Sequence, residues 1–503
     1  MTAEPHSLKR LTARSVKWNL IDRVVSIVLY TAIGIVLARE LDPTDFGLVG
    51  TVLMFQAFAS LFVDSGFSYA LIQRKAPTHL DYSTVLWFNL GVALAVYLLL
   101  WAASPAIARW YDQPMLLWVG RLTFLAFIFN AASMVQTNRL MKRQNVAPIA
   151  LANTVGLIAG GAVAIWLAVT LSPGEKVWAV VWQTNVLNLV RCIILWVYTR
   201  WVPAWRFSWQ SLKSFFAVGG SMMSISLLNT VFQNIYTFVI GSFSGMVKLG
   251  YYTQADKWSK MGISALSQVM TSSFLPTLSE VQDDGERFKR VSVRMNRSGS
   301  YLLLPALGFA VMLATPLFHV MFGDKWDVAV PLFQILLIRG MFTSLTSLYN
   351  NYVIAQGRPR MIVAMELVRD VTALVALAVT LPWIDIGFGD NSLWGIQLLL
   401  YGQLLASAVA WGVTVWYVAP MCGRTRLSFV SDNLPYIAVT AISMLVMWGI
   451  GMTAIDDRIN LVTMTLAGLV VYIGINALLG SRVQRELFAY LLGRPMDKPG
   501  RQA

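Results

Sequence analysis

Long apolar segments recur along almost the whole chain, and short polar connections separate them. A helix of about 20 apolar residues spans the hydrocarbon core of a bilayer. Fourteen segments have about this length, and the connections are too short for a soluble domain, so the pattern predicts an all-α polytopic membrane protein. The predicted spans are 18–39, 46–63, 83–104, 115–134, 148–170, 177–199, 215–240, 249–275, 298–321, 329–354, 361–381, 393–418, 434–454 and 459–479.

The composition agrees with this pattern and excludes several classes of protein. Of the 503 residues, 57% are hydrophobic and only 13% are charged, whereas the surface of a soluble protein needs roughly a quarter of charged residues. The only cysteines are Cys192 and Cys422, which exclude a disulfide framework and offer no metal-ligand pattern. We therefore expect no metal and no other cofactor.

Lysine and arginine residues concentrate in alternate connections. One set of connections, together with both termini, holds 26 of them, and the opposite set holds six. Basic residues accumulate on the cytoplasmic side of membrane proteins, so the count predicts an even number of spans with both termini in the cytoplasm. The same rule accounts for the net charge of +14, and we therefore expect no nucleic-acid partner.

Three motifs repeat in the same order in two halves of the chain. VLARELDPTDFGLVGTV follows the first span and matches VIGSFSGMVKLGYYTQA after the seventh, which pairs Gly47 with Gly250. AASPAIARWY matches LATPLFHVMFG, and a third match pairs Arg121 with Arg339. Two six-span repeats around a central cavity are a common plan of transporters. We therefore predict pseudo-symmetric N- and C-lobes with two extra C-terminal helices and a tail, over residues 1–205, 206–420 and 421–503.

Eleven charged residues lie inside the predicted spans. A charge in hydrocarbon costs at least about 2.5 kcal/mol and needs a partner or a water-filled cavity. Seven bases against four acids leave a positive interior, which predicts a cavity that attracts an anion. The candidate substrate-binding bases are Arg23, Arg121, Arg191, Lys257, Lys260, Arg339 and Arg369, and the acids are Asp22, Asp256, Glu366 and Asp370.

Some of these charges have a structural explanation that stays open. Asp256 and Lys260 are four residues apart, and Glu366, Arg369 and Asp370 share one helix face, so both groups can form ion pairs that hold the helices together. The three acids in these groups are also candidates for coupling to a proton or sodium gradient, because a low-dielectric wall shifts a carboxyl group toward its neutral form.

The remaining arginines differ in depth. Arg23 and Arg191 lie nearer the cytoplasmic ends of their spans, so their side chains can extend to the interface. Arg339 lies about ten residues, or roughly 15 Å, inside its span. Neither Arg121 nor Arg339 has an acid within one turn of its own helix. For these two arginines, a cavity is the better explanation.

Enzyme motifs are weak. The spacing His319-x4-Asp324 occurs in acyltransferases, but the pair lies at the extracytoplasmic end of a span, and such spacing arises often by chance. The sequence contains no Walker loop, dinucleotide-binding glycine motif, HExxH motif or Cys/His cluster. We therefore expect a protein that is not an enzyme.

Seven loop motifs resemble a known family. The motifs are VLARELDPTDFGLVG, FVDSGFSYALIQRK, IARWYDQPML, LGYYTQADKW, SSFLPTLSEVQDD, MFGDKWDVAVPLFQIL and AQGRPRM. Together they resemble the Wzx-type, colanic-acid/xanthan exporter-like branch of the multidrug/oligosaccharidyl-lipid/polysaccharide exporter superfamily. The resemblance covers roughly residues 15–420.

The resemblance implies a flippase of the bacterial inner membrane. Its substrate would be an undecaprenyl-pyrophosphate-linked oligosaccharide, moved between leaflets for exopolysaccharide, capsule or O-antigen synthesis. Membrane lipids, a polysaccharide polymerase and chain-length proteins are its further candidate partners. An ion-coupled drug or cation antiporter of the same architecture and a membrane polysaccharide polymerase or ligase remain as alternatives.

The topology is testable with fusion reporters. Reporters joined at Arg143, Arg290 and Arg358 should give cytoplasmic signals, and reporters joined at Lys176 and Lys325 should give periplasmic signals, because of the charge asymmetry. Alkaline phosphatase and green fluorescent protein fusions measure the two sides. A consistent exchange of signals beyond any one connection would contradict the fourteen-span arrangement.

Overall fold

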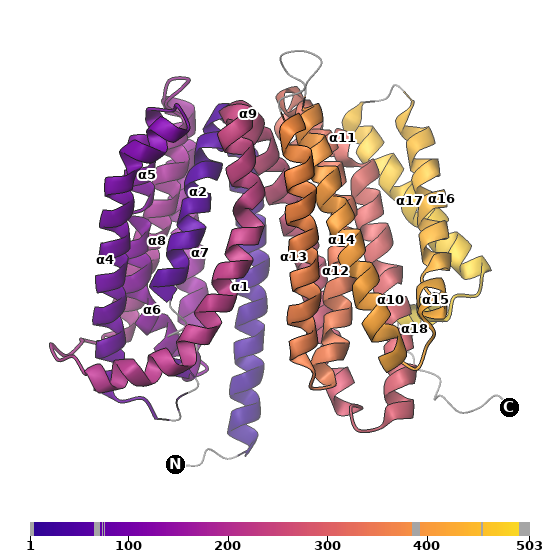
Figure 1. The fold of residues 1–503 in the computed structure, drawn as a ribbon, viewed down its shortest axis with the longest axis horizontal. Helices are drawn as coiled ribbons and strands as arrows, with labels where there is room; N and C mark the ends of the chain where they lie inside the picture. The colour runs from indigo at the N-terminus through magenta and orange to yellow at the C-terminus, as the bar shows by residue number, and fades with distance from the viewer. Residues whose placement is uncertain are drawn as a thin grey trace. The chain divides into compact units, whose positions relative to one another are not determined.

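The computed structural model describes residues 5–64, 71–72, 74, 76–384, 393–453 and 456–491. Every regular element in these segments is a helix (Figure 1). Among the described residues, ten helices are long and apolar enough to cross a membrane, or eleven if the bent pair α10 and α11 counts as one span. The chain is therefore a multi-pass helical membrane protein. Parts of the motif at 62–75 and of the predicted tail lie outside the described residues.

The chain divides into two compact units, Met1–Thr253 and Gln254–Ala503. The extent of the predicted lobes, ending at 205 and 420, stays a prediction. The first unit contains α1 (Pro5–Glu40), α2 (Pro43–Asp64), α4 (His79–Trp110), α5 (Met115–Thr123), α6 (Ala126–Lys142), α7 (Ala147–Thr170), α8 (Val177–Thr199) and the first part of α9 (Trp209–Glu280).

The second unit contains the rest of α9 and the remaining helices of the chain. These are α10 (Gly285–Met312), α11 (Ala314–Phe322), η1 (Asp324–Ala329), α12 (Val330–Ala355), α13 (Pro359–Thr380), η2 (Leu381–Trp383), α14 (Trp394–Met421), α15 (Arg426–Ser431), α16 (Leu434–Gly451), α17 (Asp457–Leu478) and α18 (Arg482–Leu491).

The structure shows helix kinks and breaks within or between several of the predicted spans. The spans 215–240 and 249–275 lie on either side of a kink within α9 at Gly245 (φ 81°), a non-helical backbone conformation that favours glycine. The span 298–321 bends by 63° between α10 and α11. The span 115–134 is divided between α5 and α6. The count of fourteen spans therefore stays a prediction.

A backbone carbonyl at the break between α5 and α6 accepts a hydrogen bond from a side chain of another helix. A helix break within a membrane frees backbone groups that need new hydrogen-bond partners. The buried Asn185 amide of α8 donates to the Leu122 carbonyl over 3.0 Å. This side chain therefore adds a hydrogen bond at the break, where the Leu122 carbonyl also accepts from the Leu125 amide.

A reciprocal glycine contact joins α2 to α9 within the first unit. A Cβ atom on Gly47 would overlap the Met246 carbonyl oxygen, and a Cβ atom on Gly250 would overlap the Pro43 carbonyl oxygen. Met246 precedes Gly250 by four residues, as Pro43 precedes Gly47. The glycines that the sequence repeat pairs thus occupy equivalent positions in one contact. Small residues allow helix backbones to approach closely where the hydrophobic effect cannot drive helix association.

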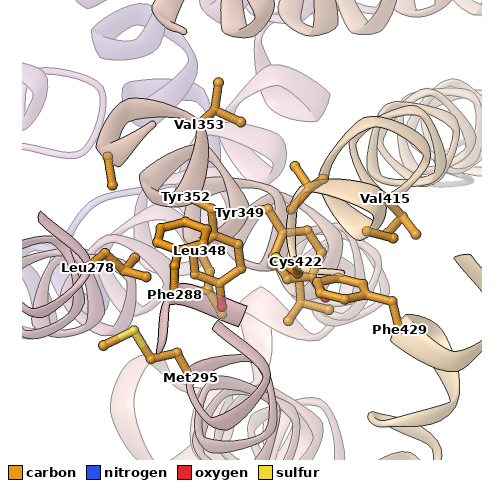
Figure 2. Packing of buried hydrophobic residues seen from close by; sticks show 14 of the residues in the cluster. Leu278, Phe288, Met295, Leu348, Tyr349, Tyr352, Val353, Val415, Cys422 and Phe429 are labelled. Atoms are coloured by element: carbon orange, nitrogen blue, oxygen red, sulfur yellow. The ribbon is translucent and has the colours of Figure 1, made fainter. Parts of the chain in front are cut away.

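An aromatic cluster forms a core of the second unit (Figure 2). Tyr349 and Tyr352 of α12, Phe288 of α10 and Phe429 of α15 are each at most 1% exposed. The Tyr349 hydroxyl donates to Asn296 over 2.9 Å, and the Tyr352 hydroxyl donates to the Ser292 carbonyl over 3.2 Å. The hydroxyl groups therefore find partners, as buried tyrosines usually do.

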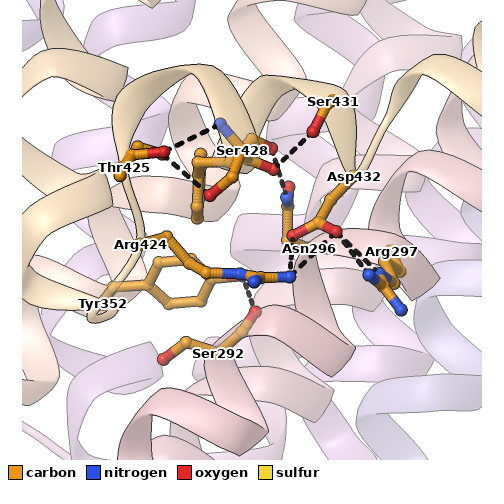
Figure 3. Close-up of polar contacts among 10 residues, drawn as sticks. Ser292, Asn296, Arg297, Tyr352, Arg424, Thr425, Ser428, Ser431 and Asp432 are labelled. Atoms are coloured by element: carbon orange, nitrogen blue, oxygen red, sulfur yellow. Dashed lines mark hydrogen bonds and ion pairs between the residues drawn. The ribbon is translucent and has the colours of Figure 1, made fainter.

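A buried carboxylate lies beside this core (Figure 3). Asp432, 8% exposed, accepts hydrogen bonds from Arg297 of α10 and from Arg424, whose Nη2 atom lies 3.1 Å from Oδ2. Two guanidinium groups on one carboxylate compensate for its burial. This cluster ties α10 to the connection between α14 and α16.

The two extra C-terminal helices pack against α10 and α11. The Tyr472 hydroxyl of α17 donates to the Tyr301 carbonyl of α10 over 2.9 Å. A Cβ atom on Gly468 would lie 2.6 Å from the sulfur of Met447, so α16 and α17 approach closely at this glycine. The pair therefore belongs to the second unit.

The reciprocal glycine contact predicts a position-specific loss of stability. Gly250→Ala should destabilise the protein by about 1–3 kcal/mol because the added methyl group meets backbone that cannot move away by a rotamer change. Gly91→Ala is the matched control, since no atom lies within 4 Å of its added Cβ. Thermal melting of the purified variants in one detergent measures the effect. Equal melting temperatures for the two variants would contradict the close contact.

Candidate functional site

Four of the predicted intramembrane charges form two ion pairs in the second unit. The Lys260 ammonium lies 2.6 Å from Asp256 Oδ2 on α9. The Arg369 guanidinium lies 2.9 Å from Asp370 Oδ1 on α13, although the two residues are adjacent in sequence. Each pair is locally neutral, so neither Lys260 nor Arg369 offers an uncompensated charge to a substrate.

Glu366 stands apart from these pairs. Its side chain is half-buried on α13, and it makes no hydrogen bond or ion pair with any residue that the structure describes. The expected pairing of Glu366 with Arg369 is replaced by the pairing of Arg369 with Asp370. Glu366 is therefore the acid of this group that has no partner among the described residues.

A polar cluster joins three helices of the first unit. Asp22 of α1 accepts a hydrogen bond from the Asn153 amide of α7 over 3.1 Å, while its Oδ1 atom is buried without a hydrogen-bond partner among the described residues. Arg191 of α8 interacts electrostatically with Asp22 and with Tyr30. Sequence reasoning identified the charges but missed Asn153. The spacing of Asp22, Ser26 and Tyr30, four residues apart on one face of α1, was the available signal for a polar surface.

Arg121 is held by two tryptophans of the first unit. Its guanidinium carbon lies 4.0 Å from the Trp101 ring centroid and 5.2 Å from that of Trp118. Its Nε atom is buried and has no hydrogen-bond partner among the described residues. Stacking on a ring face leaves the in-plane donors of a guanidinium available. Sequence reasoning did not anticipate these tryptophans.

Arg339 lies in the middle of α12 in the second unit. Its side chain is half-buried, and its Nε atom is buried without a hydrogen-bond partner in the described part of the chain. The next residue, Gly340, packs against Ile263 of α9. Buried polar groups normally have partners, so an unpartnered guanidinium nitrogen at this depth points to a missing ligand or water.

Arg23 and Lys257 are exposed on the surfaces of their helices. The Lys257 ammonium lies 5.5 Å from the Trp258 ring centroid, which is within the range of a cation–π contact. The structure therefore separates the seven predicted bases into groups. Lys260 and Arg369 are paired, and Arg23 and Lys257 are exposed. Arg121, Arg191 and Arg339 each have a buried Nε atom without a hydrogen-bond partner among the described residues, and Arg191 differs from the other two because it interacts electrostatically with Asp22.

His319 has partners other than the residue in the His319-x4-Asp324 motif. Its Nδ1 atom lies 2.8 Å from Asp457 of α17, and its Nε2 atom lies 2.5 Å from Asp327 of η1. These contacts join the extra helices to the end of α11. Within the described residues, no group of three or more His, Cys, Asp or Glu side chains could hold a metal ion.

Sequence comparisons show which family and which proteins this chain resembles. The profile of the family described as "Polysaccharide biosynthesis protein" matches residues 36–331. The chain is 26% identical over 354 residues to the teichuronic acid biosynthesis protein TuaB of Bacillus subtilis, covering 70% of this chain and 73% of that protein. It is 25% identical over 360 residues to the lipopolysaccharide biosynthesis protein WzxC of Escherichia coli, covering 70% and 71%.

A solved structure has the same fold. The lipid II flippase MurJ, in an inward closed conformation, matches with a TM-score of 0.71 over 96% of this chain and all of that chain, at 11% identity. At this identity the likeness concerns the fold alone. The family profile covers more than half of the chain and agrees with the resemblance carried by the loop motifs. The chain therefore belongs to the polysaccharide biosynthesis protein family.

Proposed function

We propose that this protein is a flippase of the bacterial inner membrane for undecaprenyl-pyrophosphate-linked oligosaccharides. The relatives named for teichuronic acid and lipopolysaccharide synthesis support this class of substrate. The MurJ fold supports a transporter of a lipid-linked head group. In this proposal the protein moves the oligosaccharide to the periplasmic leaflet, where the saccharide enters an exopolysaccharide, a capsule or an O-antigen.

The observation that carries the proposal is the pair of arginines with free donors. Arg121 and Arg339 lie within apolar segments, and each keeps a buried Nε atom without a partner in the described residues. A guanidinium group binds phosphate through forked donors. An arginine in this state is prepared for an anionic head group and needs water until that group arrives.

The physical task explains why polar and apolar features occur together. A sugar head group cannot cross hydrocarbon unless polar walls replace its hydration. The polyprenyl tail needs no such walls and can stay in the lipid through a lateral opening. We propose that Arg121 and Arg339 line the predicted central cavity, one from each repeat. We also propose fourteen spans with both termini in the cytoplasm.

The alternatives fit the observed charges less well. A drug or cation antiporter needs several uncompensated acids, whereas Asp256 and Asp370 are each paired with a base and only Glu366 of these three has no partner among the described residues. A polymerase or ligase needs a large outward domain for its active site, and the predicted outward connections are short. The protein needs no catalytic reaction in this proposal, because an ion gradient or later consumption of the product supplies the energy.

The role of the arginines is testable by substitution. Arg339→Ala should weaken transport of the lipid-linked oligosaccharide about tenfold to a hundredfold, because a charge-assisted hydrogen bond contributes about 1.5–3 kcal/mol. Arg339→Lys should restore only part of the activity, since lysine lacks the fork. Proteoliposomes that report the leaflet of a labelled oligosaccharide lipid measure the rate, and the matched control is Arg109→Ala at an exposed helix end.

Arg121 needs a second readout because its loss also removes stacking on two tryptophans. Arg121→Cys and Arg339→Cys, in a protein without Cys192 and Cys422, should react with a small water-soluble thiol reagent. Inaccessibility of both positions would contradict a water-filled chamber. Full polysaccharide export by the Arg121→Ala/Arg339→Ala protein would contradict the binding role.

Ion coupling is testable at Glu366. We propose Glu366, Asp256 and Asp370 as coupling acids, and Glu366→Gln is the cleanest variant because it leaves no ion-pair partner behind. The variant should lose the dependence of transport on the pH or sodium gradient. Glu286→Gln, which alters a surface pair with Lys289, is the control. Normal transport by Glu366→Gln with unchanged pH and sodium dependence would reject this role.

A further inference from the structure

A cationic pocket lies at one end of the first unit, apart from Arg121 and Asp22. It has a volume of about 380 Å³, within the size range of small-ligand pockets. The ends of α4 and α6 and the segment after α8 form its wall. Its lining includes three basic residues of one helix end and three rings, namely Arg139, Lys142, Arg143, His79, Tyr82 and Trp201.

Arg139 is oriented by aromatic rings rather than by an acid. Its guanidinium carbon lies 5.6 Å from the Tyr82 ring centroid and 5.0 Å from that of Trp201. Trp201 is in turn held by the His79 ring, at 5.5 Å between centroids. The Arg139 Nη1 atom is buried and has no hydrogen-bond partner among the described residues. The rings therefore hold the guanidinium plane while its edge keeps a free donor.

The other two bases differ in how firmly they are held. The Lys142 ammonium donates to the carbonyls of Leu71 and Ile72 over 3.3 Å each, and also to that of Arg74. Arg143 follows the last residue of α6 and is exposed. Lys142 therefore fixes one wall of the pocket, and Arg143 is free to turn toward a ligand.

The positive charge of the pocket is not neutralised by a lining carboxylate. The acid nearest to it along α4 is Asp81, which is already engaged. Asp81 accepts from the Thr78 amide over 2.8 Å and lies 3.3 Å from Arg74. Basic residues at a helix C-terminus also interact favourably with the helix dipole. That effect does not explain a buried, unpartnered guanidinium nitrogen.

We propose that this pocket receives the diphosphate of a polyprenyl-linked saccharide at the cytoplasmic face, before the head group enters the transport pathway. The inference rests on the proposed function and on the predicted cytoplasmic location of the α6 end. Two arginines, beside the positive charge of a lysine whose ammonium donates to backbone carbonyls, suit a group with two linked phosphates better than the single phosphodiester of a bulk phospholipid. Forked arginine donors suit phosphate oxygens.

The experiment measures binding of farnesyl diphosphate to the purified full-length protein in detergent. The Arg121→Ala/Arg339→Ala background is used, so that the proposed transport cavity does not contribute. In this background, Arg139→Gln should weaken the binding about tenfold to a hundredfold. Arg143→Gln should weaken it less. Arg206→Gln is the matched control, because Arg206 is an exposed arginine of the same unit that does not line the pocket.

Competitors separate the possible sources of phosphate. Farnesyl monophosphate and phosphatidylglycerol should compete at least tenfold more weakly than the diphosphate. Equal competition by phosphatidylglycerol would overturn the proposal in favour of a phospholipid site. Equal weakening by Arg206→Gln and Arg139→Gln, at unchanged melting temperature, would overturn it in favour of general electrostatic attraction.

A transport assay distinguishes this proposal from the proposed function. In the wild-type background, Arg139→Gln should raise the substrate concentration needed for half-maximal flipping more than it lowers the maximal rate. If the diphosphate binds in an Arg139-dependent way but the wild-type protein flips no substrate, the pocket proposal is supported and the flippase function is rejected. Normal flipping with diphosphate binding insensitive to Arg139→Gln would reject the pocket alone.

Discussion

A charge inside a bilayer must have a partner or water, and this constraint organises the protein. Most intramembrane charges meet it locally, as in Asp256 with Lys260 at 2.6 Å and Arg369 with Asp370 at 2.9 Å. Breaking either pair would leave a charge whose burial is unfavourable by several kcal/mol. Arg121 and Arg339 differ from these pairs, because each has a buried Nε atom without a partner among the described residues and no acid within one turn of its own helix. A buried polar group without a partner needs an explanation, and a bound water or ligand is one.

Close packing of small residues supports these polar positions. Helices in a membrane gain little from hydrophobic burial and associate through van der Waals contact. The reciprocal contact of Gly47 and Gly250 allows two backbones to meet, and on α7 a Cβ on Gly160 would lie 2.6 Å from the Gln183 carbonyl oxygen of α8. Such contacts set the positions of whole helices. In the second unit, the aromatic core around Tyr349 packs the helices through large buried side chains instead.

The basic residues of the connections serve more than topology. Arg297 and Arg424 compensate for the buried Asp432, so two of the predicted cytoplasmic charges hold helices together. Arg139, Lys142 and Arg143 enclose a pocket instead. Basic residues on the predicted cytoplasmic side therefore have two kinds of role. Those beside a carboxylate hold helices together, and those without one are available to bind a ligand. This division follows from the high desolvation penalty of an unpaired buried charge.

The sequence by itself determined the class of protein, the charge asymmetry and the set of charges in its apolar segments, because apolar length and residue type are local properties. It also identified the family through its loop motifs. The spacing of Asp256 and Lys260 already allowed their ion pair, but tertiary structure decided which of the other charges have partners. Helix periodicity identifies neighbours on one helix, but it cannot place Trp101 against Arg121, Asn153 against Asp22 or Trp201 against Arg139. These partners lie 20 to 131 residues apart in sequence, and packing of separate helices brings them together.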